Sequence, residues 1–214
     1  MTGVPVRDAA TVILVRDAGT DPKILMGQRG AGAAFMPSKF VFPGGAVDEA
    51  DAEVALGAPL SEPCATRLRS DSRVSPSALA AAAIRELWEE TGLRLARPGP
   101  PAPWPGFGGA PDPSALRFIF RAVTPPGRPR RFDARFFVAD AAAIAGDPDD
   151  FSAAEDELSH LGWRPLDEIR ALDLPFITEV VLGELAASLP RLEPPETVPF
   201  FRNDDEALAV SRFR

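Results

Sequence analysis

The spacing of apolar and polar residues changes several times along the chain, and each change indicates a different element. Short apolar runs that are rich in β-branched or aromatic residues and bounded by charged or turn-forming residues are typical of buried strands. Such runs predict strands at 8–16, 23–29, 39–42, 132–138 and 161–164. Residues 116–123 are apolar with interspersed arginine, which fits either a strand or a short helix.

Apolar residues three and four positions apart predict two longer helices. The first begins at Ser75-Pro76, because serine is a favoured N-cap and proline a favoured first helical residue. It ends before Gly92, a typical residue after a helix C-terminus. The apolar face of this helix holds Ala80, Ala83, Ile84 and Leu87. The second helix is expected from about 176 to 188, after a shorter helix that begins at 165–169.

Three segments lack a clear period. Residues 52–74 are expected to form an inserted loop with room for a short helix. Residues 97–114 hold seven prolines and four glycines, which predicts an irregular loop. Its Trp104 and Phe107 are expected to anchor it to the body of the protein, with a ligand-stacking role as the alternative. The Pro-rich, acidic tail 189–214 is expected to lie across the body or to serve an interface.

Strands followed by a helix, more strands and closing helices predict an α+β sandwich. A chain of 214 residues is long enough to bury a core and is expected to form a single domain over 1–214. Within that domain, 52–74 and 97–114 are the predicted insertions.

The overall composition restricts the classes of partner. A net charge of −8 argues against a general nucleic-acid binder or a binder of anionic membranes, because both require a basic surface. No segment approaches the ~20 apolar residues of a membrane span. A single Cys64 excludes an internal disulfide and suits a reducing compartment. The cytoplasm is therefore the expected location, and His160, the one histidine, leaves oxygen atoms as the available metal ligands.

Three carboxylates crowd one face of the first long helix. Glu86, Glu89 and Glu90 stand at i, i+3 and i+4, so they share a face. Ionised carboxylates that close repel one another, and a hard divalent cation such as Mg²⁺ would compensate them. The alternative is a solvated helix face on which Arg85 pairs with Glu89 at i, i+4.

Arginines gather in a second stretch, after the turn at 125–127. Four of them lie within eight positions, and guanidinium forks match the oxygens of a phosphate group. They are Arg128, Arg130, Arg131 and Arg135. A solvated strand edge that balances the acidic surface is the equal alternative.

The acidic helix and the glycine turn before it together resemble the signature of the Nudix hydrolases. That signature is a glycine, five residues, Glu, seven residues, and then Arg-Glu-apolar-x-Glu-Glu-x-Gly-apolar. Its second half is matched at every specified position by Arg85-Glu86-Leu87-Trp88-Glu89-Glu90-Thr91-Gly92-Leu93. The first half departs, because Gly45 is followed at the Glu position by Asp51, and 33 residues rather than seven separate Asp51 from Arg85. Such a split signature is similar to the Nudix subgroup that contains the peroxisomal coenzyme A diphosphatase.

The resemblance implies an αβα sandwich with a mixed sheet and a Mg²⁺- or Mn²⁺-dependent hydrolysis of a diphosphate linked to another moiety. Glu89 and Glu90 resemble the principal metal ligands, and Glu86 resembles a third ligand or the group that activates water. The carbonyl of Gly45 would complete the metal shell, and Arg85 would hold the glutamates by ion pairs. A further acid often comes from a downstream loop in this family, and Glu157 is the choice here over Glu155. Asp51, at the position of the first signature Glu, is a weak candidate for the function of that Glu.

The expected substrate is a nucleoside diphosphate derivative, and the subgroup resemblance points to coenzyme A or an acyl-CoA. ADP-ribose, NADH and dinucleoside polyphosphates fit the same metal helix, and a nucleotide-sensing Nudix module without turnover is a further alternative. Selectivity is expected to come from loops 30–38, 52–74 and 97–114. A homodimer is compatible with the family.

Overall fold

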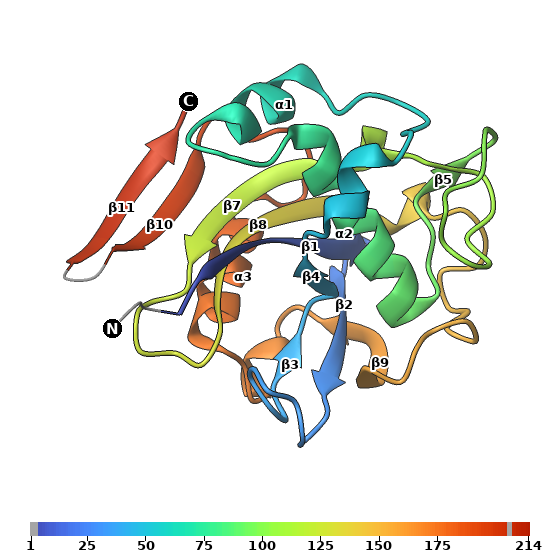
Figure 1. Cartoon of the computed structure of the whole chain (residues 1–214). Helices are drawn as coiled ribbons and strands as arrows, with labels where there is room; N and C mark the ends of the chain where they lie inside the picture. Colours follow the sequence, from blue (N-terminus) through green and yellow to red (C-terminus); the bar gives the residue numbers. More distant parts are fainter. Residues whose placement is uncertain (1–3, 205–206) are drawn as a thin grey trace.

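A mixed nine-stranded sheet forms the middle layer of the protein. The computed structural model describes residues 4–204 and 207–214 (Figure 1). The strands of this sheet are β1 (Val6–Arg16), β2 (Lys23–Arg29), β3 (Phe40–Val41), β4 (Gly44–Ala46), β7 (Arg117–Val123), β8 (Arg131–Asp140), β9 (Leu158–Pro165), β10 (Val198–Asp204) and β11 (Ala207–Phe213). A separate two-stranded sheet joins β5 (Ala96–Arg97) to β6 (Ala110–Pro111).

The strand order is β11-β10-β7-β8-β1-β2-β3, with β4 beside β1 and β9 beside β2. β1 pairs in parallel with β8 along its whole length. On its other side, β1 pairs with β2 at Val15 and Arg16, whereas Ala9, Ala10 and Thr11 pair with β4. The sheet therefore forks beside β1, with β2 leaving on one branch and β4 on the other.

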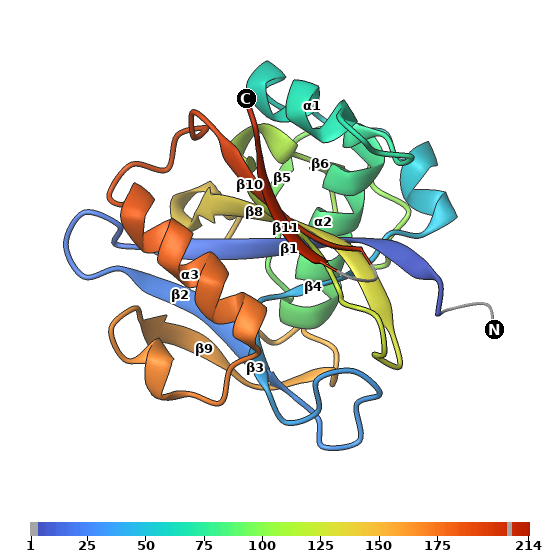
Figure 2. The ribbon, with the colours of Figure 1, turned by 90° about the vertical axis from the view of Figure 1, so that its left-hand side faces the viewer.

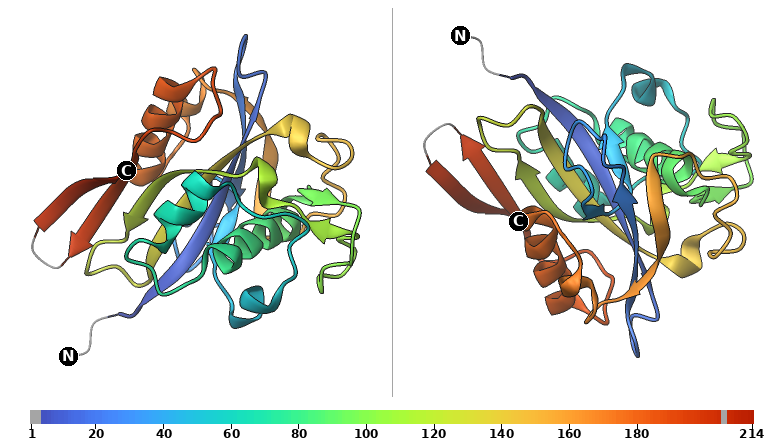
Figure 3. Two further views of the ribbon diagram at one scale, coloured as in Figure 1. Left: turned by 90° about the horizontal axis from the view of Figure 1, so that it is seen from above. Right: turned by 90° about the horizontal axis from the view of Figure 1, so that it is seen from below.

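Helices cover both faces of the sheet, as the two perpendicular views in Figure 2 and Figure 3 show. The helices are α1 (Glu62–Arg69), α2 (Pro76–Thr91) and α3 (Phe176–Ser188), and the 3-10 turns are η1 (Glu49–Glu53), η2 (Pro113–Ala115), η3 (Ala141–Ala143) and η4 (Ile169–Ala171). α1 and α2 lie on one face and α3 lies on the other. The αβα sandwich with a mixed sheet is confirmed.

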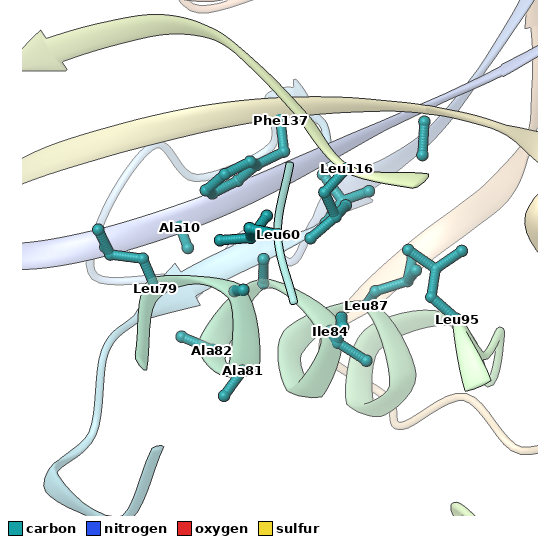
Figure 4. Packing of buried hydrophobic residues seen from close by; sticks show 14 of the residues in the cluster. Ala10, Leu60, Leu79, Ala81, Ala82, Ile84, Leu87, Leu95, Leu116 and Phe137 are labelled. Carbon is teal, nitrogen blue, oxygen red and sulfur yellow. The ribbon is translucent and has the colours of Figure 1, made fainter. Parts of the chain in front are cut away.

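α2 lies close to the sheet because its inner residues are small. Its alanines, together with Leu79, Ile84 and Leu87, pack in one cluster with Leu116 and Phe137 (Figure 4). The Ser75 side chain accepts a hydrogen bond from the backbone of Ala78. At the other end, Gly92 adopts φ 73°, a left-handed conformation that favours glycine. Both predicted ends of this helix are confirmed.

The opposite face of the sheet packs on α3. Val181, Leu182 and Leu185 are buried against Ile13 and Phe120. The bounds predicted for this helix and for the strand at 23–29 agree with the structure. Residues 116–123 form strand β7 rather than a helix. Within the ranges 4–204 and 207–214, no helix is both long enough and apolar enough to cross a membrane.

Three sequence-based expectations were incomplete or wrong. The tail does not lie across the body: β10 and β11 form a hairpin at one edge of the sheet (Figure 1). Pro199 lies opposite Arg212 of β11 and outside the pairing of β10 with β7, which involves Phe200 and Phe201. The predicted loop 97–114 contains β6 and half of β5. At 165–169, where a short helix was predicted to begin, the structure has the last residue of β9, a turn and the first residue of η4.

Candidate metal and diphosphate site

The acidic face of α2 meets the glycine strand β4. A Cβ atom at Gly45 would lie 2.3 Å from Oε2 of Glu86, so only glycine lets this carboxylate approach the backbone so closely. The backbone N–H of Gly44 donates a 2.8 Å hydrogen bond to Glu90. The sequence predicted a glycine turn here, and the structure shows the short strand β4 against which two glutamates pack.

Arg85 organises the carboxylates around it. It donates to both oxygens of Asp51, from Nε and Nη2, at 2.9 Å each. Its Nη1 contacts Glu86 at 2.7 Å and Glu89 at 2.9 Å. Asp51 is 2% exposed, so the position where the family signature has Glu is occupied here by the buried anchor of Arg85. The expected role of Arg85, holding glutamates by ion pairs, agrees with these contacts.

The pKa values of the three glutamates on α2 are all raised, which favours their neutral forms in the absence of a cation. Burial raises the pKa of Glu86 to about 7, against the opposing effect of Arg85. Burial also raises the pKa of Glu90 well above its usual range, and the neighbouring charges of Glu86 and Glu157 raise it further. The pKa of Glu89 is raised by burial as well. A cation bound among these groups would favour their ionised forms.

The donor set fits a hard divalent cation. Such ions prefer carboxylate and carbonyl oxygens, and Glu86, Glu89, Glu90 and the Gly45 carbonyl lie on two adjoining elements. In the part of the chain that the structure describes, no three His, Cys, Asp or Glu side chains form a finished ligand cluster. The reason lies in the contacts above, since Arg85 engages Glu86 and Glu89, and Gly44 engages Glu90.

A pocket of about 890 Å³ opens beside this acidic cluster. It lies on the α3 side of the sheet, where Thr11, Ala134 and Phe136 line it. The fork beside β1 lets Gly45 and Glu86 border the same pocket, although α2 covers the other face. Its walls are largely apolar, and its cationic side chains are Arg7, Arg29, Lys39, Arg128 and Arg130.

Glu157 borders the pocket and is paired with Arg29, whose Nη2 lies 2.8 Å from Oε1 of Glu157. The Nε of Arg29 is buried without a hydrogen-bond partner among the described residues. Glu155 does not line the pocket, and its backbone N–H instead donates to the carbonyl of Glu89. The choice of Glu157 over Glu155 as the downstream acid stays a prediction.

The predicted arginine cluster is divided between different surroundings. Arg128 and Arg130 are exposed and line the pocket. Arg131 donates to the carbonyls of Thr124 and Asn203. Arg135 is 1% exposed and points to the opposite face of the sheet. The structure thus brings two of the four arginines to the pocket.

Two of the three loops expected to set selectivity lie elsewhere. Residues 34–37 line the pocket, and Phe35 forms an edge-to-face pair with Phe132 at 5.1 Å. No residue of 52–74 or 97–114 lines it. Trp104 and Phe107 are buried, which confirms that they anchor their loop. Both loops pack on the α2 face of the sheet, and their expected role in selectivity stays a prediction.

Sequence reasoning missed the cations at the end of β2 and before β3. Arg29 and Lys39 lie ten residues apart, yet they border one pocket because β2 pairs with β3. A basic residue at the end of each of two hairpin strands was the available signal. The buried role of Asp51 had no signal in the sequence, because its partner Arg85 lies beyond the insertion.

Known proteins that are similar to this chain indicate its family. No protein-family model matches the chain. A Caenorhabditis elegans protein named "Putative nudix hydrolase 7" is 27% identical over 180 residues, which are 73% of this chain and 50% of that protein. The chain therefore spans about half the length of this curated relative.

Solved structures give a fuller match. A crystal structure of a NUDIX hydrolase from Alicyclobacillus acidocaldarius is 31% identical, covers 86% of this chain and 92% of its own, and has a TM-score of 0.62. The NUDIX domain of Shewanella oneidensis NrtR, in complex with ADP ribose, is 14% identical, with coverage of 86% and 88% and a TM-score of 0.51, and it supports the fold alone. Together with the signature residues around Gly45 and Glu86, the match to the Alicyclobacillus enzyme shows that this chain belongs to the Nudix hydrolase family.

Proposed function

We propose that the protein is a divalent-metal-dependent diphosphatase that hydrolyses a nucleoside diphosphate linked to another moiety. The observation that carries this proposal is the position of Glu86, Glu90 and Glu157. These acids influence one another electrostatically, and Glu86 and Glu157 border a pocket whose other walls supply cations. Family membership and the donor chemistry support the same conclusion.

Each part of the site has a defined task in the proposed reaction. Glu86, Glu89, Glu90 and the Gly45 carbonyl would hold Mg²⁺ or Mn²⁺. When bound, such an ion neutralises phosphate oxygens and lowers the pKa of bound water. Arg128 and Arg130 would bind the diphosphate by charge-assisted hydrogen bonds.

Proton transfer is assigned to a carboxylate at the pocket wall. Glu86 or Glu157 would accept the proton from the attacking water. The water oxygen forms a bond to one phosphorus, the bridging P–O bond breaks, and two phosphomonoesters leave. Arg29 holds the Glu157 carboxylate in place before this step.

For the substrate, we infer coenzyme A or an acyl-CoA, with ADP-ribose, NADH and dinucleoside polyphosphates as alternatives. The split signature supports the first choice. A pocket of about 890 Å³ with apolar walls and several cations can accept a diphosphate together with a long arm. The ADP ribose bound by the NrtR domain keeps that alternative in the panel. Cytoplasmic location and a homodimer stay predictions.

The test is incubation with each compound in Mg²⁺ or Mn²⁺ and identification of the products. We expect coenzyme A to yield adenosine 3′,5′-bisphosphate and 4′-phosphopantetheine. Glu89→Gln and Glu90→Gln should each lower the rate by about 10³-fold, since several kcal/mol of transition-state stabilisation depend on the metal. Glu179→Gln, on the exposed side of α3, makes the same charge change and should leave the rate unaltered.

Two results would contradict the proposal. Full activity in Glu89→Gln and Glu90→Gln would remove the metal helix from the chemistry. Tight binding of a nucleotide without any turnover, in either metal, would favour the sensing module.

A further inference from the structure

A second cleft, of about 500 Å³, lies on the face of the sheet opposite the main pocket. Successive residues of a strand point to opposite faces, and β8 shows the division directly. Ala134 and Phe136 line the main pocket, whereas Asp133 and Arg135 line the second cleft. The cleft is bounded by β1, β7, β8, β10 and the end of the insertion that splits the Nudix signature.

Two buried arginines form the floor of this cleft. Arg121 and Arg135 are directly opposite each other on β7 and β8, and they are 4% and 1% exposed. Both contact Asp133, Arg121 at 2.6 Å and Arg135 at 3.3 Å, and Arg135 also pairs with Asp8. Two positive charges thus lie side by side in the interior, and they share the carboxylate of Asp133.

The same two arginines hold the end of the insertion in place. Arg121 donates to the carbonyls of Ser70 and Asp71. Arg135 donates to the hydroxyl of Ser72 at 3.2 Å. The insertion therefore does not reach the main pocket, because the floor of the second cleft holds its last residues on this face.

Positive charge exceeds negative charge around the cleft. Its lining includes three acids, and its five basic residues are Arg69, Arg73, Arg121, Arg135 and Arg202. This excess stands out in a chain whose net charge is −8. Arg69 and Arg73 are exposed at the rim. Arg73 makes no ion pair with any residue in 4–204 or 207–214, and Arg69 makes one at 3.4 Å, with Glu62 outside the cleft.

We propose that this cleft binds a small phosphate-bearing anion at a site separate from the main pocket. Guanidinium groups match phosphate oxygens with two parallel hydrogen bonds, and exposed rim arginines can close on an anion that the buried floor attracts. Burial lowers the pKa of Arg135, against the opposing effect of the Asp133 carboxylate.

The site gives the insertion a role and does not depend on the proposed hydrolysis. The insertion begins next to Asp51, which binds Arg85 in the catalytic network. It ends just before Ser75, where α2 begins. An occupied cleft would therefore order the segment that leads into the acidic helix.

The test is calorimetric titration of the whole protein with inorganic phosphate in divalent-free buffer, so that no metal-bridged phosphate forms in the main pocket. We expect the dissociation constant for phosphate to be at least about tenfold higher in the Arg69→Gln/Arg73→Gln double variant than in the wild type, because the variant lacks two charged hydrogen-bond donors for the anion. Arg128→Gln/Arg130→Gln is the matched control, because it removes two exposed arginines from the main pocket. It should change the dissociation constant by less than about twofold, because distant exposed charges are screened.

Four outcomes would contradict the proposed anion site. They are no phosphate binding by the wild type, equal weakening in both double variants, weakening only in the main-pocket variant, or no weakening in either. Melting temperatures establish that the variants are folded. Should the double variant unfold, Arg73→Gln alone serves instead, with an expected weakening of about threefold.

Discussion

The acidic cluster around Arg85 and the second cleft are opposites in charge. In the acidic cluster, Arg85 serves several carboxylates, and the pKa of Glu86 and that of Glu90 are both raised by burial. The second cleft is lined by five arginines and three acids. An excess of buried carboxylate favours a bound cation, and an excess of arginine favours a bound anion. The difference shows how an acidic chain can keep sites for both.

Both regions use a buried arginine as a scaffold. Arg85 binds the buried carboxylate of Asp51 and leaves Glu86 and Glu89 only partly compensated. Arg121 binds Asp133 and the backbone of the insertion. The two buried aspartates differ in the number of their ion-pair partners. Asp133 also pairs with Arg135, whereas Asp51 pairs with Arg85 alone in the described ranges.

The largest expected effect on stability therefore comes from Arg85→Met. This change leaves Asp51, 2% exposed, as an uncompensated buried charge, which costs about 3–5 kcal/mol. Chemical denaturation measures the loss. Arg97→Met is the control, because Arg97 is half-exposed and its ion pair with Asp112 is 3.8 Å long, so its loss should stay below about 1 kcal/mol. A small loss for Arg85→Met would mean that the Arg85–Asp51 ion pair contributes little to the stability of the fold.

The next effect concerns the pH dependence of stability at the acidic cluster. The folded-state pKa of Glu86 is about 7, raised from 4.5. Between these values the folded protein binds a proton that the unfolded chain has lost, so stability falls as pH rises through this window. The full effect is about 3 kcal/mol, since one pKa unit corresponds to about 1.4 kcal/mol.

The measurement compares wild type with Glu86→Gln, both without metal, by denaturation between pH 5 and pH 8. The wild type should lose stability relative to the variant as pH rises, because glutamine cannot ionise. Mg²⁺ should restore wild-type stability at pH 8 and have little effect at pH 5, where the carboxylate is protonated. A pH-independent difference between the two proteins would contradict the raised pKa.

The sequence predicted the parts of the fold that local chemistry determines. Ser75, Pro76 and Gly92 mark the ends of α2, and both ends agree with the structure. The C-terminal hairpin was missed because prolines and acids mask the strand pattern in a composition-based reading. Its place beside β7 depends on a contact between residues about 80 positions apart, such as Asn203 with Val123, and no local pattern encodes such a contact.

The candidate site, like the fold, was predictable only where local sequence determines it. The spacing of Glu86, Glu89 and Glu90 is local, so their common helix face was predictable. The faces on which Arg128 and Arg135 lie were not predictable, because alternate residues of a strand point to opposite faces and the register of β8 was unknown. The insertion 52–74 was expected to set selectivity, and its packing on the face opposite the main pocket depends on long-range contacts such as that of Arg121 with Ser70.

The smallest expected effect lies at the junction of the two regions. Ser75 follows the wall of the second cleft and caps the acidic helix, and its Oγ accepts a 3.1 Å hydrogen bond from the Ala78 N–H. Ser75→Ala should cost about 1 kcal/mol, the usual value of an N-cap. Ser77→Ala, two residues on and exposed, should cost less than about 0.5 kcal/mol. If Ser75→Ala costs the larger amount yet leaves phosphate affinity unchanged, the cleft depends on its arginines and not on the order of the helix start. If the affinity falls with the cap, the two regions are coupled through this one residue.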